Sequence, residues 1–197
     1  LYRKENIVGK SPAEIIKAGI SMSFIPEDRL GMGLVASMDI THNMLLKSYK
    51  EGKPVILNRK PARVLAEKLV DTLDISTPSI STPVRKLSGG NVQKVLLGRE
   101  IQSNPQLLIT AYPVRGLDIN SSYTIYDLLN EQKKRGVAIL FIGEDLDVLL
   151  ELCDRILVLC HGENMGIVDA GKATKEMLGL MMTGQKLGRD GEINDRQ

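Results

Sequence analysis

The feature that most constrains the fold is a series of short apolar runs in the second half of the chain. The runs at 106–112 (QLLITAY), 137–142 (VAILFI) and 155–160 (RILVLC) are rich in strand-forming residues, and amphipathic stretches such as 121–136 separate them. Apolar strands that alternate with helices are typical of a parallel sheet with crossover helices. The pattern therefore predicts an α/β fold in which all three runs are parallel strands.

The first half of the chain reads mainly as helices joined by loops. Ser11 is expected to cap a short helix that has Pro12 in its first turn and ends at Gly19. The alternating segment 20–25 predicts a strand. Further helices are expected at 39–49, 62–73 and 91–103, and loops at 26–33, 51–61 and 74–86.

In the helix expected at 62–73, apolar residues recur at the spacing of one helical face. These residues are Leu65, Leu69, Val70 and Leu73. After the third apolar run, segment 164–171 predicts an edge strand, 174–182 a closing helix and 185–197 a frayed polar tail.

Composition places the chain among globular proteins with a packed core. It has 197 residues, 43% of them hydrophobic, and a net charge of +2, which offers no basic footprint for nucleic acid. Cys153 and Cys160 are interpreted as reduced core thiols, and His42 and His161 as surface residues. The absence of a long apolar run or a signal-like N-terminus leads us to expect a cytosolic chain without a membrane span.

A corner of small residues stands at 86–94 (KLSGGNVQK), directly before an expected helix. The Ser88 hydroxyl and two residues without Cβ would let the backbone approach an anion, and the helix N-terminus would point at it. An ordinary tight turn before a helix would show the same three residues. The string 8–11 (VGKS) resembles the end of a phosphate loop, but Lys4 stands where its first glycine belongs, so we interpret it as a helix cap.

The longer string 87–94 (LSGGNVQK) closely resembles the signature motif of ATP-binding cassette (ABC) ATPases, in the form found in bacterial sugar and nucleoside importers. The resemblance extends from about Asn6 to Gly184. It implies a partial P-loop ATPase core with an ABC-type helical subdomain, from the second of two tandem cassettes. The segments that carry it are 19–35 (GISMSFIPEDRLGMGLV), 115–120 (RGLDIN), 146–163 (LDVLLELCDRILVLCHGE) and 178–184 (LGLMMTG).

The resemblance also implies how the chain is organised. Residues 1–34 correspond to the remnant of the N-terminal part of the cassette, including the segment equivalent to its glutamine loop. Residues 35–95 correspond to the helical subdomain with the signature motif, and residues 96–184 to the C-terminal half of the ATPase core. Residues 185–197 form the polar tail.

Four positions depart from an active cassette. The strand that should end in Asp-Glu ends in Ala111 and Tyr112, so it offers neither a metal ligand nor a base. Glu144 replaces the switch histidine, and Glu27 replaces the glutamine that senses the γ-phosphate. Since the phosphate loop is absent as well, we expect no ATP hydrolysis and no metal site in this segment alone.

The signature of one cassette completes the site whose phosphate loop belongs to the facing cassette. The resemblance therefore implies that ATP and Mg²⁺ bind only at a composite site with a partner nucleotide-binding domain, usually part of the same polypeptide. It also implies integral membrane permease subunits as partners and a peripheral position at the cytoplasmic face of the membrane. The residues expected at the nucleotide are Ser88, Gly89, Gly90, Asn91, Gln93 and Asp118.

Two other functions fit part of the pattern. A stand-alone pseudo-ATPase would be an interaction module that binds no nucleotide. DNA-repair and chromosome ATPases also use a signature of this kind, but they should show an intact Asp-Glu pair and long heptad arms, neither of which is found here.

Overall fold

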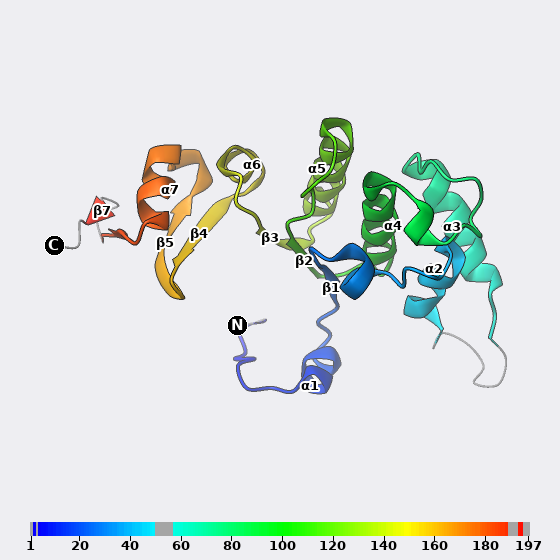
Figure 1. Cartoon of the computed structure of the whole chain (residues 1–197). Coiled ribbons are helices and arrows are strands. Elements are labelled where there is room, and N and C mark those ends of the chain that lie inside the picture. Colours follow the sequence, from blue (N-terminus) through cyan, green and yellow to red (C-terminus); the bar gives the residue numbers. More distant parts are fainter. Residues whose placement is uncertain (1, 3, 50–56, 189–192, 195–197) are drawn as a thin grey trace. The chain divides into compact units, whose positions relative to one another are not determined.

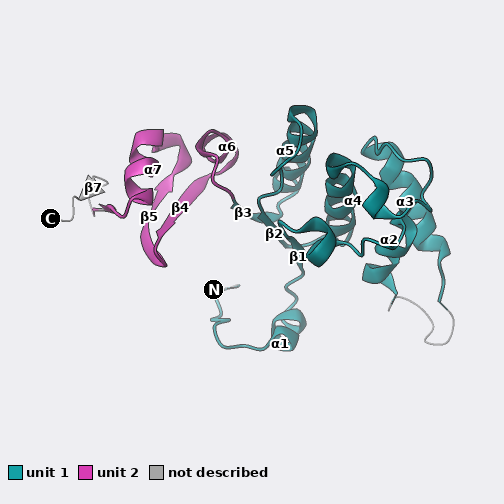
Figure 2. Cartoon of the chain, in the orientation of Figure 1, with its two compact units in different colours: residues 1–142 teal, residues 143–197 magenta. Residues whose placement is uncertain are grey.

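The computed structural model describes residues 2, 4–49, 57–188 and 193–194 (Figure 1). The chain divides into two compact units, Leu1–Ile142 and Gly143–Gln197 (Figure 2). In the described part of the chain, no helix is long and apolar enough to cross a bilayer.

The first unit contains the expected mixture of helices and strands. Its elements are α1 (Pro12–Lys17), β1 (Met22–Ile25), the π-helical turn η1 (Arg29–Gly33), α2 (Ile40–Ser48), α3 (Lys60–Thr72), the 3-10 turn η2 (Val84–Lys86), α4 (Gly89–Gln102), β2 (Leu107–Ala111), α5 (Ile119–Lys134) and β3 (Ala138–Ile142). The strands predicted at 20–25, 106–112 and 137–142 and all the helices predicted in this unit are confirmed.

Strands β1, β2 and β3 form one parallel sheet in that order. Met22 pairs with Leu107, which in turn pairs with Ala138. Because all three strands run the same way, the residues that follow β1 and β2 come out at the same edge of the sheet. This edge is where ligands bind in open parallel sheets.

Helix α4 lies at the centre of the first unit and contacts β1, α2, α3 and α5. Its side chains Val95, Leu96 and Leu97 are fully buried, and each such burial contributes roughly 1.5–3 kcal/mol. A Cβ at Gly98 would overlap Leu69 of α3, so this glycine allows the two helices to approach closely. Helix α4 therefore determines where the neighbouring helices sit.

The apolar stripe predicted on α3 is confirmed. Leu69 is 3% exposed, and its three companions are partly buried against the same core. They are Leu65, Val70 and Leu73.

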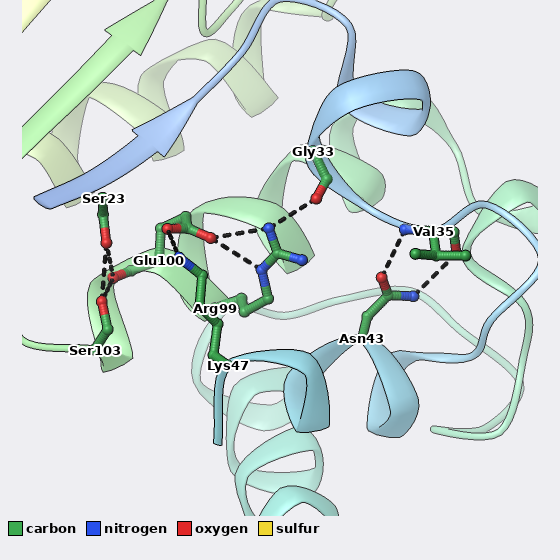
Figure 3. A network of polar contacts seen from close by, with 8 residues as sticks. All are labelled: Ser23, Gly33, Val35, Asn43, Lys47, Arg99, Glu100 and Ser103. Atoms are coloured by element: carbon green, nitrogen blue, oxygen red, sulfur yellow. Dashed lines mark hydrogen bonds and ion pairs between the residues drawn. The ribbon is translucent and has the colours of Figure 1, made fainter. Parts of the chain in front are cut away.

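A buried carboxylate anchors α4 to its neighbours (Figure 3). Glu100 is 1% exposed; its Oε2 lies 2.7 Å from Lys47 Nζ of α2, and its Oε1 accepts from Arg99 Nε at 3.0 Å. Arg99 also donates to the Gly33 carbonyl at 2.7 Å. A buried charge is stable only when it is paired and hydrogen-bonded, and here two cations supply the pairing.

Asn43 of α2 fastens the loop that follows η1 (Figure 3). Its Oδ1 accepts from the Val35 N–H at 2.8 Å, and its Nδ2 lies 3.2 Å from the Val35 carbonyl oxygen. The same Nδ2 lies 3.3 Å from the Met38 oxygen and 3.0 Å from the Asp39 oxygen. Since Asn43 is completely buried, these contacts satisfy an amide that water cannot reach.

The second unit contains α6 (Leu146–Leu152), β4 (Arg155–Cys160), β5 (Glu163–Asp169), the 3-10 turn η3 (Ala170–Lys172), α7 (Lys175–Met182), β6 (Lys186–Leu187) and β7 (Ile193–Asn194). Its core includes Ile156, Val158, Leu178 and Met181. Cys153 and Cys160 are not joined in a disulfide, and both are partly buried against this core.

The prediction that 155–160 is a third parallel strand of the same kind is wrong. This run forms β4, which pairs antiparallel with β5 in a separate two-stranded sheet. Only His161 and Gly162 join the two strands, with φ of 49° and 79°. A two-residue connection with positive φ at both positions makes a hairpin, because a parallel crossover needs a dozen or more residues.

Two segments that were expected to lack regular structure contain short elements. The loop predicted at 26–33 contains η1, which Asp28 caps by accepting from the Gly31 N–H at 2.8 Å. The tail predicted to be frayed contains β6 and β7, which pair antiparallel. Most of the loop predicted at 51–61 lies outside the described residues.

Replacing Asn43 with Ala tests the fastening of the loop after η1. The change removes the acceptor and donor that bind the loop backbone, and we expect it to lower the free energy of unfolding by about 2 to 4 kcal/mol. Urea denaturation, with amide exchange of α2 as a local probe, measures the loss. The matched control is Asn120→Ala on the exposed side of α5, which should stay within about 0.5 kcal/mol. Equal losses of stability in the two variants would contradict the role of Asn43 in holding the loop after η1.

Candidate functional site

The predicted small-residue corner is the N-terminus of the central helix α4. Ser88 is the N-cap residue, and its Oγ accepts from the Asn91 backbone N–H at 3.4 Å and from Asn91 Nδ2 at 3.0 Å. Ser88 and Gly89 are exposed, whereas Gly90 is buried. An exposed helix N-terminus with no acidic residue in its first turn is suited to contact with an anion.

Asp118 lies beside this corner because α4 and α5 begin side by side. A Cβ at Gly90 would overlap Ser121 Oγ and would stand 3.8 Å from Asp118 Oδ2. Only glycine therefore allows this approach without displacing Ser121. The structure thus brings together Ser88–Gly90 and Asp118, which the sequence assigned to the site from two separate motifs.

Asp118 is an exposed carboxylate held in place by the start of α5. Its Oδ1 accepts from the Ser121 backbone N–H at 2.9 Å, and its Oδ2 accepts from Ser121 Oγ at 2.7 Å. These two bonds lower the pKa of Asp118 below its ordinary value, and the bond from the Ser121 backbone has the larger effect. Asp118 is therefore a fixed, ionised acceptor at neutral pH.

Asn91 and Gln93 stand behind the exposed corner. Asn91 is half-buried; it donates to Ser88 Oγ, and its Oδ1 accepts from the Ser76 N–H at 3.1 Å. Gln93 is completely buried, and its Oε1 accepts from Arg29 Nε at 2.7 Å. The structure therefore places both side chains where they orient other residues of the corner.

Three of the positions that the sequence resemblance singled out, Glu27, Ala111 and Tyr112, follow or end β1 and β2. Ala111 is the last residue of β2, and Tyr112 follows it with a φ of 48°. Arg115 forms an ion pair with Glu27, and its guanidinium carbon lies 5.8 Å from the centre of the Tyr112 ring. A cation-π contact and an ion pair thus occupy the edge of the sheet at the ends of β1 and β2.

This edge does not fit Mg²⁺. The ion prefers carboxylate and water oxygens, but Ala111 and Tyr112 offer no carboxylate and Glu27 is already paired with Arg115. Within the ranges that the structure describes, no group of three or more His, Cys, Asp or Glu side chains could hold a metal ion.

The remaining sequence candidates, Glu144 and the string 8–11, belong to other segments of the chain. Glu144 is an exposed residue of the second unit, two positions before α6 begins. In the string 8–11, Ser11 caps α1 and forms a capping box with Glu14, so the interpretation as a helix cap is confirmed.

Sequence reasoning missed Arg29 and Arg115. Both stand inside motifs that drew attention for other residues, Arg29 after Glu27 and Arg115 before Asp118. Burial lowers the pKa of Arg29 more than the charge of Glu27 raises it, and the arginine stays protonated at neutral pH. The available signal was the presence of two arginines at the ends of two neighbouring parallel strands.

The fold is that of the ATP-binding cassettes, as comparison with solved structures shows. The chain superposes on the dimeric cassette MJ0796, whose structure is a post-hydrolysis state bound to ADP and Pi, with a TM-score of 0.67. The aligned region is 19% identical and covers 81% of this chain and 68% of that one. A mixed α/β ABC ATPase fold is thereby confirmed.

The sequence relatives are more specific. The chain is 41% identical over 177 residues to the xylose import ATP-binding protein XylG of Moorella thermoacetica. The aligned region covers 90% of this chain and 35% of that protein. The chain is also 37% identical over 194 residues to the guanosine import ATP-binding protein NupO of Bacillus subtilis, covering 96% and 38%. The chain is thus homologous to ATP-binding proteins of sugar and nucleoside importers and spans about a third of their length. No protein-family model matches it.

The contacts of Asp118 predict how its carboxyl group titrates. Because the folded-state pKa is lowered, its contribution to stability is present above about pH 3.9, the ordinary pKa, and is lost as the pH falls through the lower folded value. NMR titration of the carboxyl carbon should show this lowered pKa. Ser121→Ala should move the pKa of Asp118 back toward the ordinary value, and an unmoved pKa would contradict the role of the Ser121 hydroxyl.

Proposed function

We propose that this chain is the C-terminal, catalytically degenerate nucleotide-binding segment of a sugar or nucleoside importer ATPase. In this proposal it supplies the signature corner to ATP held by a partner cassette. The observation that carries the proposal is the exposed pair Ser88 and Gly89 at the N-terminus of α4, beside the fixed carboxylate of Asp118. A corner of this kind can serve a facing molecule without any phosphate loop of its own.

The individual groups have separate tasks in this proposal. Ser88 Oγ–H and the N-terminal backbone of α4 bind the γ-phosphate oxygens of the facing ATP, which the positive end of the helix favours. Asp118 accepts a hydrogen bond across the seam and helps to position the attacking water of the partner site. Mg²⁺ belongs to that partner site, where it would neutralise phosphate charge.

The degenerate edge of the sheet supports the same division of labour. With Ala111 and Tyr112 at the end of β2 there is no base to polarise water, and Arg115 neutralises Glu27. One working site per pair of cassettes follows from this asymmetry.

The partners in this proposal are a nucleotide-binding domain, usually in the same polypeptide, and integral membrane permease subunits at the cytoplasmic face of the membrane. The printed names of the relatives, which include xylose and guanosine import, support a simple sugar or a nucleoside as cargo. The helical subdomain, residues 35–95, would transmit closure to the permease. Residues 1–34 and 96–184 would belong to the ATPase core.

The proposal predicts weak nucleotide binding by the chain alone. Half of a composite site offers few contacts to the nucleotide. Calorimetry with MgATP should therefore give a dissociation constant above about 10 μM, which corresponds to a binding free energy of roughly −7 kcal/mol. Tighter binding would show that the chain has a nucleotide site of its own. Complete absence of binding in the assembled importer as well would favour the alternative, a stand-alone pseudo-ATPase module.

Ser88→Arg in the complete gene product, assembled with its permease, tests the role of the signature directly. The long side chain would fill the exposed corner and keep the facing γ-phosphate away, so ATP turnover should fall at least about a hundredfold. The control is Ser81→Arg, at another exposed serine of the same unit, which should keep turnover within about twofold. Unchanged turnover in Ser88→Arg would count decisively against a role in trans.

A further inference from the structure

We propose that Arg29 is a positioning residue of the signature face, one that holds Ser88 and Asp118 at a fixed spacing. The inference rests on the proposed function, because it concerns how the same corner is kept in shape. Arg29 belongs to η1, so it comes from a different part of the chain than either residue it serves.

One guanidinium contacts both segments of the site. Arg29 Nε donates to Gln93 Oε1 of α4 at 2.7 Å, and Arg29 Nη2 donates to the carbonyl oxygen of Arg115. Its Nη1 lies 3.8 Å from the position of a Cβ on Gly89. Arg29 therefore links the first turns of the signature helix to the turn that leads to Asp118.

The acceptor on α4 is an unusual choice for a helical core. Gln93 is completely buried, and among the described residues its Nε2 has no hydrogen-bond partner. An apolar side chain of the same shape would avoid this unfavourable burial, because replacing a polar group and its partner together is nearly neutral. The bond from Arg29 to its oxygen is therefore a polar contact that compensates for burying this amide.

The geometry requires an arginine. A guanidinium is planar and presents donors in a rigid fork, so it can bond to Gln93 and to the Arg115 carbonyl in two fixed directions. A lysine ammonium carries the same charge on a flexible stem and lacks this fork. Arg29→Lys therefore separates positioning by the fork from a simple effect of positive charge.

The test is ATP hydrolysis by the complete gene product with its permease, comparing Arg29→Lys, Gln93→Leu and the double variant. We expect Arg29→Lys to lower kcat at least about tenfold while KM for ATP stays within about twofold, since the misplaced corner acts on the reacting phosphate. Gln93→Leu should lower kcat comparably. The double variant should be no slower than the slower single variant, because both changes remove one interaction.

Several controls separate positioning from general damage. Arg63→Lys changes an arginine that pairs with Glu67 on the surface of α3 and should leave kcat within about twofold. Rates are compared at equal ATP bound per complex, which corrects for any misfolded fraction. If Gln93→Leu fails to fold, Arg29→Lys alone decides through its separate effects on kcat and KM.

The outcomes are distinguishable. A kcat within about twofold of wild type in Arg29→Lys, or losses that multiply in the double variant, would overturn the inference about Arg29. If such a result for Arg29→Lys is accompanied by loss of turnover in Ser88→Arg, only the inference about Arg29 is overturned and the proposed function stands. If Ser88→Arg leaves turnover unchanged, both are overturned.

Discussion

The burial of helix α4 is the constraint on which the rest of the first unit depends. Its middle is apolar and fully enclosed, and its C-terminal half carries Glu100, whose buried carboxylate needs both Lys47 and Arg99. Displacing the helix would leave that charge unpaired in the core. Because the helix is fixed in this way, its exposed first turn presents Ser88 at a defined place, and the core thereby supports a surface corner more than two helical turns away.

The edge of the sheet and the corner at the start of α4 carry different sets of contacts. At the edge formed by β1 and β2, Arg115 pairs with Glu27 and contacts the ring of Tyr112. The corner at α4 is built from the starts of α4 and α5. Its proposed role therefore does not depend on catalytic groups at the sheet edge. Arg29 connects the two regions, because its Nη2 donates to the carbonyl oxygen of Arg115.

The sequence predicted most elements because local rules decide them. The helical spacing of Leu65 to Leu73, the cap at Ser11 and the strand runs before and after α5 all appear as expected. The direction of β4 was predicted incorrectly because an apolar run has the same composition in parallel and antiparallel sheets. The short turn at His161 and Gly162 carried the deciding information, since a two-residue connection permits only a hairpin.

By itself the sequence determined that the chain is α/β, that a small-residue corner precedes a helix, and that Ala111 and Tyr112 end an apolar run without a carboxylate. These properties depend on residue type and near neighbours. The tertiary structure alone decided that Gln93 faces the interior and that Gly90 touches Ser121. It also brought Arg29 to Gln93 across 64 positions and Arg115 to Glu27 across 88. Contacts of that range depend on how the strands and helices pack together, which no local pattern encodes.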